Sequence, residues 1–293
     1  MWTAGLLGPY NGAMITPGTP FLKMHGLGND FVIVDTRHTS FTPTSALVRA
    51  LSDRRTGIGC DQFITIEPPR AEGWAFMGIR NADGEVVESC GNAARCVGAV
   101  LLAETKGAPV CLDTLAGPIV AEAASEERVA VDMGPARLAW DQIPLAGPAD
   151  TLSLDLAVGP LSAPVAVSVG NPHAVFFVPE AEAVDLDRWG PLVEHHPLFP
   201  RRVNVEVVHQ RPDGSLRMRV WERGVGITRA CGTGACAVLI AARRRGLVPG
   251  ETADVVLDGG TLTITWRESD SHVVMAGTAT RVYSGVLDPG FTP

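Results

Sequence analysis

Residues 88–98 read ESCGNAARCVG and residues 230–240 read ACGTGACAVLI, so a Cys-Gly pair twice precedes an apolar, alanine-rich stretch. Each apolar segment continues beyond the quoted stretch and ends in one or more cations followed by a glycine, at residues 107 and 246, as helices commonly do. A helix that is apolar on almost every side has to be buried. The two stretches therefore predict two buried helices, with Cys90 and Cys231 at their N-terminal ends.

Polar side chains recur at matched distances along the two halves of the chain. To within one residue, the matching positions are Asn29, Gln62, Asn81 and Cys90 in the first half and Asn171, Asn204, Glu222 and Cys231 in the second. Four polar positions that keep their spacing to within one residue are hard to obtain by chance. Internal similarity of this kind predicts two copies of one structural unit that face each other.

Short segments rich in β-branched and aromatic residues, bounded by Gly, Pro, Asn or Asp, indicate strands. They are FVIVD, QFITIE, WAFMGI, AVFFV, VNVEVV, LRMRVW and LTITW. We therefore expect an α/β fold of two pseudo-symmetric domains, each a curved mixed sheet wrapped around a central buried helix, with the active site in the interdomain cleft. The expected bounds are 20–133 plus 276–288 for the domain with Cys90, and 134–275 for the domain with Cys231.

Residues 1–19 are expected to form a loose extension, and Met14 could equally be the natural start. This segment has no basic region and no apolar run long enough for a signal peptide or a membrane span. We therefore expect a cytoplasmic protein, in which the six cysteines are thiols.

Charge and spacing disfavour several classes of partner. A net charge of −8, without a clustered basic face, argues against nucleic acid or an anionic membrane and favours a small molecule. The cysteine spacings do not fit a zinc knuckle, and the Gly-x-Gly segments do not open helices as a dinucleotide fingerprint requires. We expect neither a metal nor a cofactor, and we interpret Arg243 to Arg245 as a solvated helix cap rather than a phosphate site.

A thiol at a helix N-terminus lies beside free backbone N–H groups and the positive end of the helix dipole. These lower its pKa and also form a site for a carboxylate. Two such thiols on opposite sides of one carboxylate suggest inversion at Cα, because one can remove a proton while the other returns one to the far face. Taken alone, each cysteine equally fits core packing, and Asn29 or Asn171 beside a glycine fits a turn.

Segments spread over nearly all of the chain, from Phe21 to about Leu287, resemble the diaminopimelate epimerase family. They are KMHGLGNDFVIVD, GIGCDQ, RNADGE, SCGNAARC, VGNPHAVFFV, RVNVEVV, WERGVGITRACGTGACA and GGTLTITW. The resemblance implies an isomerase that needs no pyridoxal phosphate and interconverts LL- and meso-2,6-diaminopimelate, on the way to lysine and peptidoglycan precursors. It also implies the fold inferred above and a homodimer.

The same resemblance implies roles for individual residues. Cys90 and Cys231 would be the catalytic acid/base pair, with His173 and Glu222 tuning the two thiols and Tyr283 at the dimer interface. The backbone N–H groups that hold the reacting carboxylate would be those of Gly91, Asn92, Gly232 and Thr233. The remaining substrate-binding residues would be Asn29, Gln62, Asn81, Asn171, Asn204, Glu222 and Arg223.

Two departures and two alternatives accompany this interpretation. Ile227 stands where the family more often has an acidic residue, and Ala93 replaces a common glycine, which affects the local loop and helix-start geometry.

A proline or hydroxyproline racemase shares the two-thiol logic but typically has His where this chain has Asn92, and it lacks the pair Glu222 and Arg223. A non-enzymatic binder on the same scaffold would need neither thiol.

Overall fold

A computed structural model describes residues 18–39, 41–125, 127–288 and 291 of the chain. The possible start at Met14 lies outside the described residues, as does most of the expected extension. Among the helices that are described, none is long and apolar enough to cross a membrane.

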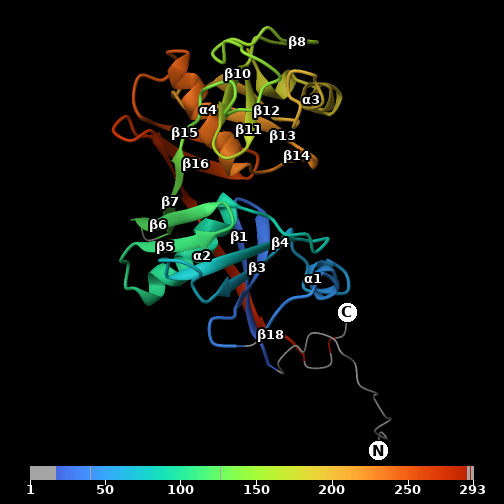
Figure 1. The fold of residues 1–293 in the computed structure, drawn as a ribbon, viewed down its shortest axis with the longest axis vertical. Coiled ribbons are helices and arrows are strands. Elements are labelled where there is room, and N and C mark those ends of the chain that lie inside the picture. Colours follow the sequence, from blue (N-terminus) through green and yellow to red (C-terminus); the bar gives the residue numbers. More distant parts are fainter. Residues whose placement is uncertain (1–17, 40, 126, 289–290, 292–293) are drawn as a thin grey trace, which may run out of the picture.

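The first half of the molecule places helix α2 inside a curved sheet (Figure 1). Its elements are β1 (Pro20–Gly26), β2 (Asn29–Asp35), α1 (Ser45–Ser52), β3 (Gln62–Glu67), β4 (Ala75–Asn81), α2 (Gly91–Glu104), β5 (Val110–Thr114), β6 (Gly117–Ser125) and β7 (Arg128–Pro135).

The second half repeats this arrangement around helix α4, after a small separate hairpin of β8 and β9. Its elements are β8 (Ala157–Val158), β9 (Leu161–Ser162), β10 (Val165–Ser168), β11 (Pro172–Phe177), the 3₁₀ helix η1 (Ala181–Ala183), α3 (Leu186–Glu194), β12 (Asn204–Gln210), β13 (Leu216–Glu222), β14 (Gly226–Thr228), α4 (Gly232–Arg244), β15 (Thr252–Leu257), β16 (Gly260–Trp266) and β17 (His272–Thr278). A final strand, β18 (Thr280–Val286), returns to the first half and pairs with β1.

The strand pairings of the two halves follow one scheme. From β1 to β7, successive pairs are antiparallel, parallel, antiparallel, parallel, antiparallel and antiparallel. The series β10, β11, β12, β13, β15, β16 and β17 gives the same order. Even the register matches, because Phe31 lies opposite Gln62 and His173 lies opposite Asn204. The predicted pair of similar mixed sheets is confirmed.

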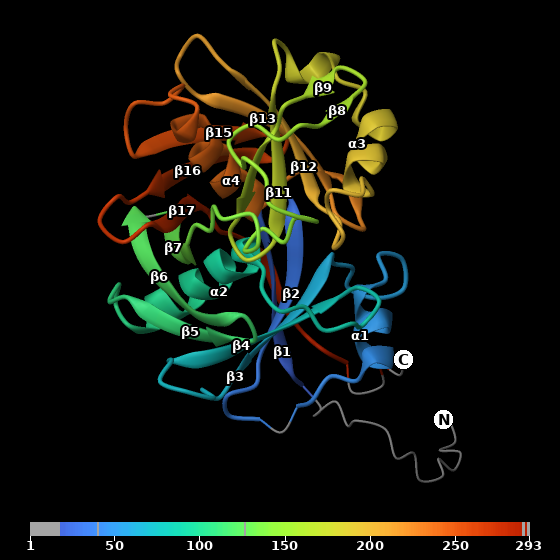
Figure 2. The same cartoon turned by 45° about the horizontal axis from the view of Figure 1, so that its top comes forward.

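The two sheets join edge to edge, since β7 pairs antiparallel with β17 to make one 16-stranded sheet. Figure 2 shows α2 and α4 in the two halves on either side of this junction. The expected domain boundary between residues 275 and 276 falls inside β17, which pairs with a strand from each half. The division into two domains with those bounds stays a prediction.

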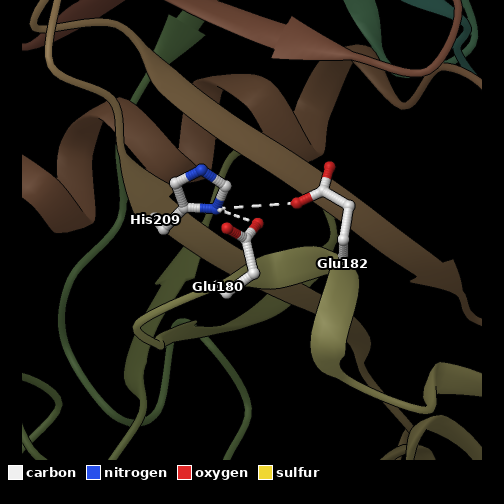
Figure 3. Close-up of side chains that lie close together, drawn as sticks. All are labelled: Glu180, Glu182 and His209. Carbon is white, nitrogen blue, oxygen red and sulfur yellow. Dashed lines mark ion pairs between the residues drawn. The ribbon is translucent and has the colours of Figure 1, made fainter.

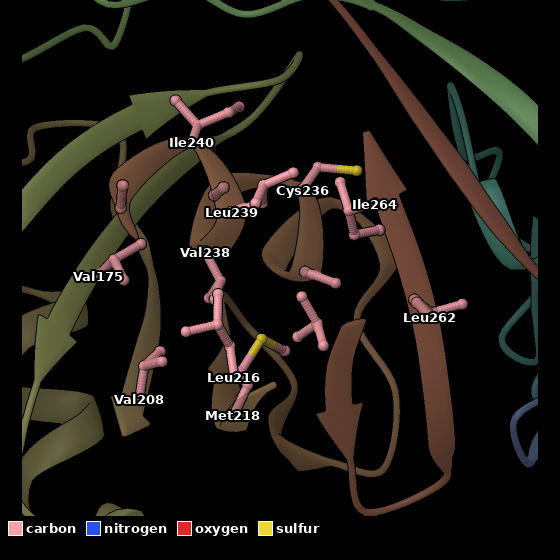
Figure 4. Packing of buried hydrophobic residues seen from close by; sticks show 14 of the residues in the cluster. Val175, Val208, Leu216, Met218, Cys236, Val238, Leu239, Ile240, Leu262 and Ile264 are labelled. Carbon is pink, nitrogen blue, oxygen red and sulfur yellow. The ribbon is translucent and has the colours of Figure 1, made fainter. Parts of the chain in front are cut away.

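Helices α2 and α4 are buried because they are apolar almost all round. Every residue of α4 from Gly234 to Ala242 is buried, and the helix packs against Val175, Leu216 and Ile264 of the surrounding strands (Figure 4). A separate apolar core encloses α2 in the first half. This burial fixes where each helix starts, and therefore where Cys90 and Cys231 lie.

The expected solvated cap at Arg243 to Arg245 is wrong in part. Arg244 is partly buried and donates to the backbone oxygens of Thr151 and Ala166, while Arg243 donates to the Trp266 carbonyl. Only Arg245 is exposed. The triplet ties the end of α4 to neighbouring segments.

Candidate active site

A cavity of about 950 Å³ lies between the two halves. Its lining contains most of the residues expected at the site: Asn29, Gln62, Asn81, Cys90, Gly91 and Asn92 from the first half, and Asn171, Glu222, Cys231, Gly232 and Thr233 from the second. Both thiols therefore line the same cavity, each from its own half of the molecule.

Each thiol belongs to the residue that caps the N-terminus of a buried helix. Cys90 precedes α2 and Cys231 precedes α4, both in extended backbone conformation. The Cys231 sulfur accepts a hydrogen bond from the Gly234 N–H at 3.4 Å, and the Cys90 thiol lies 3.9 Å from Asn29 Oδ1. The first-turn N–H groups of both helices thus lie beside the cavity, where they can bind an anion.

Met275 leaves little room for a side chain at the residue after each cysteine, because its own side chain from β17 lies between the two helix starts. A Cβ at Gly91 would come within 2.6 Å of Met275 Cε, and one at Gly232 within 2.9 Å of its sulfur. One methionine therefore packs against the glycine of the Cys-Gly pair in both halves, so the two helix N-termini lie beside the same side chain.

Amide side chains on the first half are bonded to one another around the cavity. Asn29 accepts a hydrogen bond from Asn92 Nδ2 at 3.2 Å and donates to Asp61 at 3.0 Å. Gln62 Nε2 donates to Asn81 Oδ1 at 3.0 Å, whereas Gln62 Oε1 is buried and has no hydrogen-bond partner among the described residues. That oxygen is available to accept from an ammonium group.

On the second half, a chain of hydrogen bonds runs from the cavity wall into the core. Asn171 Nδ2 donates to Thr233 Oγ1 at 3.3 Å, and Asn171 Oδ1 lies 2.9 Å from His173 Nε2. The other ring nitrogen of His173 lies 2.7 Å from Glu206 Oε1, and both residues are fully buried. His173 thus lies behind the cavity wall and contacts it through Asn171.

Asn204 and Arg223, both expected to bind substrate, do not line the cavity. Asn204 is buried and bonds to the Pro172 carbonyl and the Arg223 N–H. The exposed Arg223 guanidinium donates to the backbone oxygen of Arg201 at 3.1 Å. The guanidinium groups that do line the cavity belong to Arg54 and Arg229.

The expectation that the helix N-termini give the thiols lowered pKa values is wrong for this structure. Burial raises the pKa of Cys90, and the backbone N–H groups of Ala93 and Asn92 only partly oppose it. Burial, together with the carboxylates of Glu222 and Glu206, raises the pKa of Cys231 well above its usual value. At each sulfur, burial raises the pKa more than the N–H groups of the helix start lower it.

Glu222 lies in the same low-polarity surroundings. Burial raises the pKa of its carboxyl group, against hydrogen bonds from the Thr228 hydroxyl and the Cys231 thiol. Glu222 thus interacts with one of the two thiols through its charge, and its role in tuning that thiol stays a prediction.

Sequence reasoning missed the charged network at the edge of the cavity. Arg54 binds both oxygens of Asp30 and one of Asp61, and the buried Lys23 also pairs with Asp30, so the pKa of Asp30 is held well below its usual value despite burial. The sequence held no local signal for this network, because its four residues are separated along the chain and only the fold brings Lys23 and Arg54 to one carboxylate.

One group of side chains among the described residues has the composition of a metal site. Glu180 and Glu182 lie 3.5 and 3.8 Å from His209 Nδ1 (Figure 3). That nitrogen already accepts the Ala181 N–H at 3.0 Å, and Glu182 pairs with Arg217 at 2.6 Å. Because these atoms have partners, the group is better explained as a hydrogen-bonded surface cluster.

A family model described as diaminopimelate epimerase matches residues 21–139 and 165–282. The chain belongs to the diaminopimelate epimerase family. Two relatives, both named diaminopimelate epimerase, come from Phenylobacterium zucineum and Rhodospirillum centenum. The first is 52% identical over 92% of this chain and 98% of its own, and the second is 50% identical over 93% and 94%.

Solved structures of other proteins share the fold. A hydroxyproline epimerase from Agrobacterium vitis matches with a TM-score of 0.65 and 20% identity, over 96% of this chain and 97% of its own. A phenazine biosynthesis protein of the PhzF family from Bacillus anthracis matches with a TM-score of 0.64 and 16% identity, over 93% and 99%. The architecture therefore extends beyond the diaminopimelate epimerase family.

Proposed function

We propose that this protein interconverts LL- and meso-2,6-diaminopimelate by moving the α-proton between two cysteines, in lysine and peptidoglycan precursor biosynthesis. The observation that carries the proposal is the cavity itself. Cys90 and Cys231 both line it, each at the start of a buried helix, and the two helices come from opposite halves.

The reacting carboxylate would lie between the two helix N-termini, on the N–H groups of Gly91, Asn92, Gly232 and Thr233. One cysteine, as thiolate, removes the α-proton and becomes a thiol. The other, as thiol, gives its proton to the opposite face of the carbanion and becomes a thiolate. The proton count balances, the configuration inverts, and the N–H groups stabilise the charge that develops on the carboxylate.

The raised thiol pKa values fit this task. A Cα–H beside a carboxylate is a very weak acid, so a thiolate with a raised pKa is a better base for it than a solvated one. Burial that keeps water from the sulfurs also strengthens the attraction between the N–H groups and the developing charge. The two thiols have to exchange roles between directions, so they titrate as a coupled pair.

The far end of the substrate carries a second ammonium and a second carboxylate, and the cavity offers groups for both. Gln62 Oε1, Asn81 and Glu222 can accept hydrogen bonds from the ammonium. Arg229 lines the cavity and can hold the carboxylate, whereas Arg54, which also lines it, is already bonded to Asp30 and Asp61. Asn204 and Arg223 would join only after a movement that turns Arg223 from the Arg201 carbonyl towards the ligand.

The experiment supplies reduced protein with LL-diaminopimelate and, separately, with L-proline, and resolves the stereoisomers by chromatography. Formation of the meso isomer without D-proline supports the proposal. Racemisation of proline alone would assign the protein to the sister racemases. Neither reaction, in protein whose thiols are shown to be free, would favour a binder without catalysis.

We also propose that the protein is a cytoplasmic homodimer with Tyr283 at the interface. Tyr283 lies on β18 with 45% of its surface exposed and packs edge-on against Phe21, with ring centres 6.1 Å apart. Val282 and Val286 of the same edge strand are also exposed. Sedimentation of the protein and of Tyr283→Asp tests this, since a dimer that becomes a monomer supports the interface and an unchanged mass contradicts it.

A further inference from the structure

Arg95 on α2 is the largest fully buried side chain among the described residues. Its guanidinium donates to Asn92 Oδ1 at 2.8 Å, to the Met275 sulfur at 3.3 Å and to the Thr278 carbonyl at 3.5 Å. No carboxylate of the described residues contacts it. A buried cation without an anion is costly, so its retention calls for a role beyond packing.

The structure makes room for this guanidinium on two sides. A Cβ at Gly26 would lie 3.0 Å from Arg95 Nη2, and one at Gly277 would lie 3.2 Å from its Nε. The Asn92 amide that Arg95 holds also donates to Asn29 and reaches the Ala230 carbonyl of the other half at 3.4 Å. Arg95 therefore lies directly beneath the Cys90 helix start and braces it.

The second half has no cation at the equivalent place. Arg95 lies five residues after Cys90, and the residue five positions after Cys231 is Cys236, which is also buried. A positive charge is therefore built into the surroundings of one thiol only.

Of the two sets of matching positions behind the thiols, only the set in the second half holds a buried acid. Glu206 and His173 are fully buried behind Cys231, and a Cβ at Gly234, in the first turn of α4, would come within 2.9 Å of Glu206 Oε1. The matching positions of the first half, by register, are Ile64 and Phe31, which carry no charge. Glu206 Oε2 has no hydrogen-bond partner among the described residues.

We propose that Arg95 and Glu206 make Cys90 the thiol of the pair that ionises first. The resting free enzyme is then ready for the isomer whose α-proton faces Cys90, with Cys90 as base and Cys231 as proton donor, whereas the opposite isomer needs the proton to pass from Cys231 to Cys90 first. Arg95 and Glu206 both act as positioning residues, since neither lines the cavity. This inference rests on the proposed two-cysteine reaction, to which it adds the order in which the two thiols ionise. After one turnover Cys90 holds the proton, and the resting state returns when that proton is lost to solvent and Cys231 regains one.

The charged and titratable groups around the pair agree with this order. The charged groups that act on the Cys90 thiol are Glu222 and Arg95, whereas those that act on Cys231 are Glu222 and Glu206. After burial, Glu222 raises the pKa of both thiols, Arg95 opposes the rise at Cys90, and Glu206 adds to it at Cys231. The other titratable groups around Arg95 are Cys96, Cys236 and Arg128, none of which lines the cavity.

The test is a pH titration of alkylation by iodoacetamide in ligand-free protein, with each cysteine peptide quantified by mass spectrometry. The midpoint is compared rather than the rate, because Cys90 is partly exposed and Cys231 is buried. We expect Cys90 to have the lower midpoint. Arg95→Met should raise the Cys90 midpoint by about one pH unit, the size expected when a nearby opposite charge is lost. Glu206→Gln should lower the Cys231 midpoint.

Arg244→Met is the matched control, because Arg244 is another arginine withdrawn from solvent and bonded to backbone oxygens, although it is only partly buried and lies at the far end of α4. It should destabilise the fold and leave both midpoints unchanged. Cys111, remote from the cavity, serves as an internal reference. A lower midpoint for Cys231, or midpoints that neither Arg95→Met nor Glu206→Gln moves, would overturn the inference.

If Arg95→Met does not fold, Glu206→Gln decides alone, since it keeps the shape of the side chain and a hydrogen bond to His173. An unchanged Cys231 midpoint in that variant would then overturn the inference. Epimerisation is measured separately on the unmodified enzyme. Full epimerisation with coincident midpoints would contradict only the order of ionisation, whereas ordered midpoints without epimerisation would contradict the proposed function.

Discussion

The two halves of this molecule share a strand scheme, a buried helix and a cysteine at the helix start, but they differ in what lies behind that cysteine. Behind Cys90 the equivalent positions hold Arg95, Phe31 and Ile64; behind Cys231 they hold Cys236, His173 and Glu206. The shared framework places two thiols symmetrically around one cavity. The unshared buried charges make the two thiols chemically unequal, as a reaction with distinct acid and base roles requires.

The strongest test of the shared part removes each thiol in turn. Cys90→Ala and Cys231→Ala should each lower the rate of epimerisation by about 100-fold or more, because inversion needs a proton group on both faces. The measurement is the initial rate of meso isomer formation. Cys111→Ala is the control and should keep full activity, because Cys111 lies outside the cavity lining. A large loss of activity in only one of these two variants would contradict the claim that each half supplies one proton-transferring thiol.

A second test concerns Met275, whose side chain packs against the first glycine of both buried helices. Gly91→Ala and Gly232→Ala should each reduce the free energy of unfolding by about 1–3 kcal/mol, since the added methyl group collides with Met275. Unfolding in urea measures the change. Combining Gly232→Ala with Met275→Ala should cost less than the two changes added together. Gly147→Ala, where no atom lies within 4 Å of the new methyl group, should be neutral.

A third test concerns Cys236, which occupies in the second half the position that Arg95 occupies in the first. Burial raises the pKa of Cys236 to about 12 from the ordinary 9.0, so the folded protein keeps a proton that the unfolded chain loses above pH 9. Stability is therefore complete below pH 9 and falls as the pH rises towards 12, by about 1.4 kcal/mol per pH unit for each such thiol.

Cys236→Ala should make that decline shallower between pH 9 and 11, as measured by urea unfolding at each pH. Cys96 behaves in the same way as Cys236, because burial also raises its pKa to about 12. Cys96→Ala should therefore give a similar change in slope. A slope that neither substitution alters would show that other groups control alkaline unfolding.

The sequence was sufficient for the features that depend on local pattern. Two apolar helices with cysteines at their starts, short β-rich runs and polar residues in matched register predicted the repeated fold and most of the residues that line the cavity. These signals are local or periodic, so they can be read without the tertiary structure.

Features that depend on packing could not be predicted in this way. Arg95 stands in an apolar helix where a single cation suggests an exposed edge, and only the fold shows that it is enclosed. The direction of the thiol pKa shifts was wrong because burial opposes the helix start and its extent is a tertiary property. Arg223 was expected at the site, but its backbone and side chain are bonded to Asn204 and Arg201 outside the cavity.

Epimerisation of LL-diaminopimelate in heavy water, followed by proton NMR at low conversion, tests the two-thiol account most directly. With one thiol on each face, the meso product should carry deuterium at the inverted centre while the remaining LL substrate stays unlabelled. Deuterium that enters the LL substrate as fast as it enters the product would mean that a single group serves both faces, and would contradict the account.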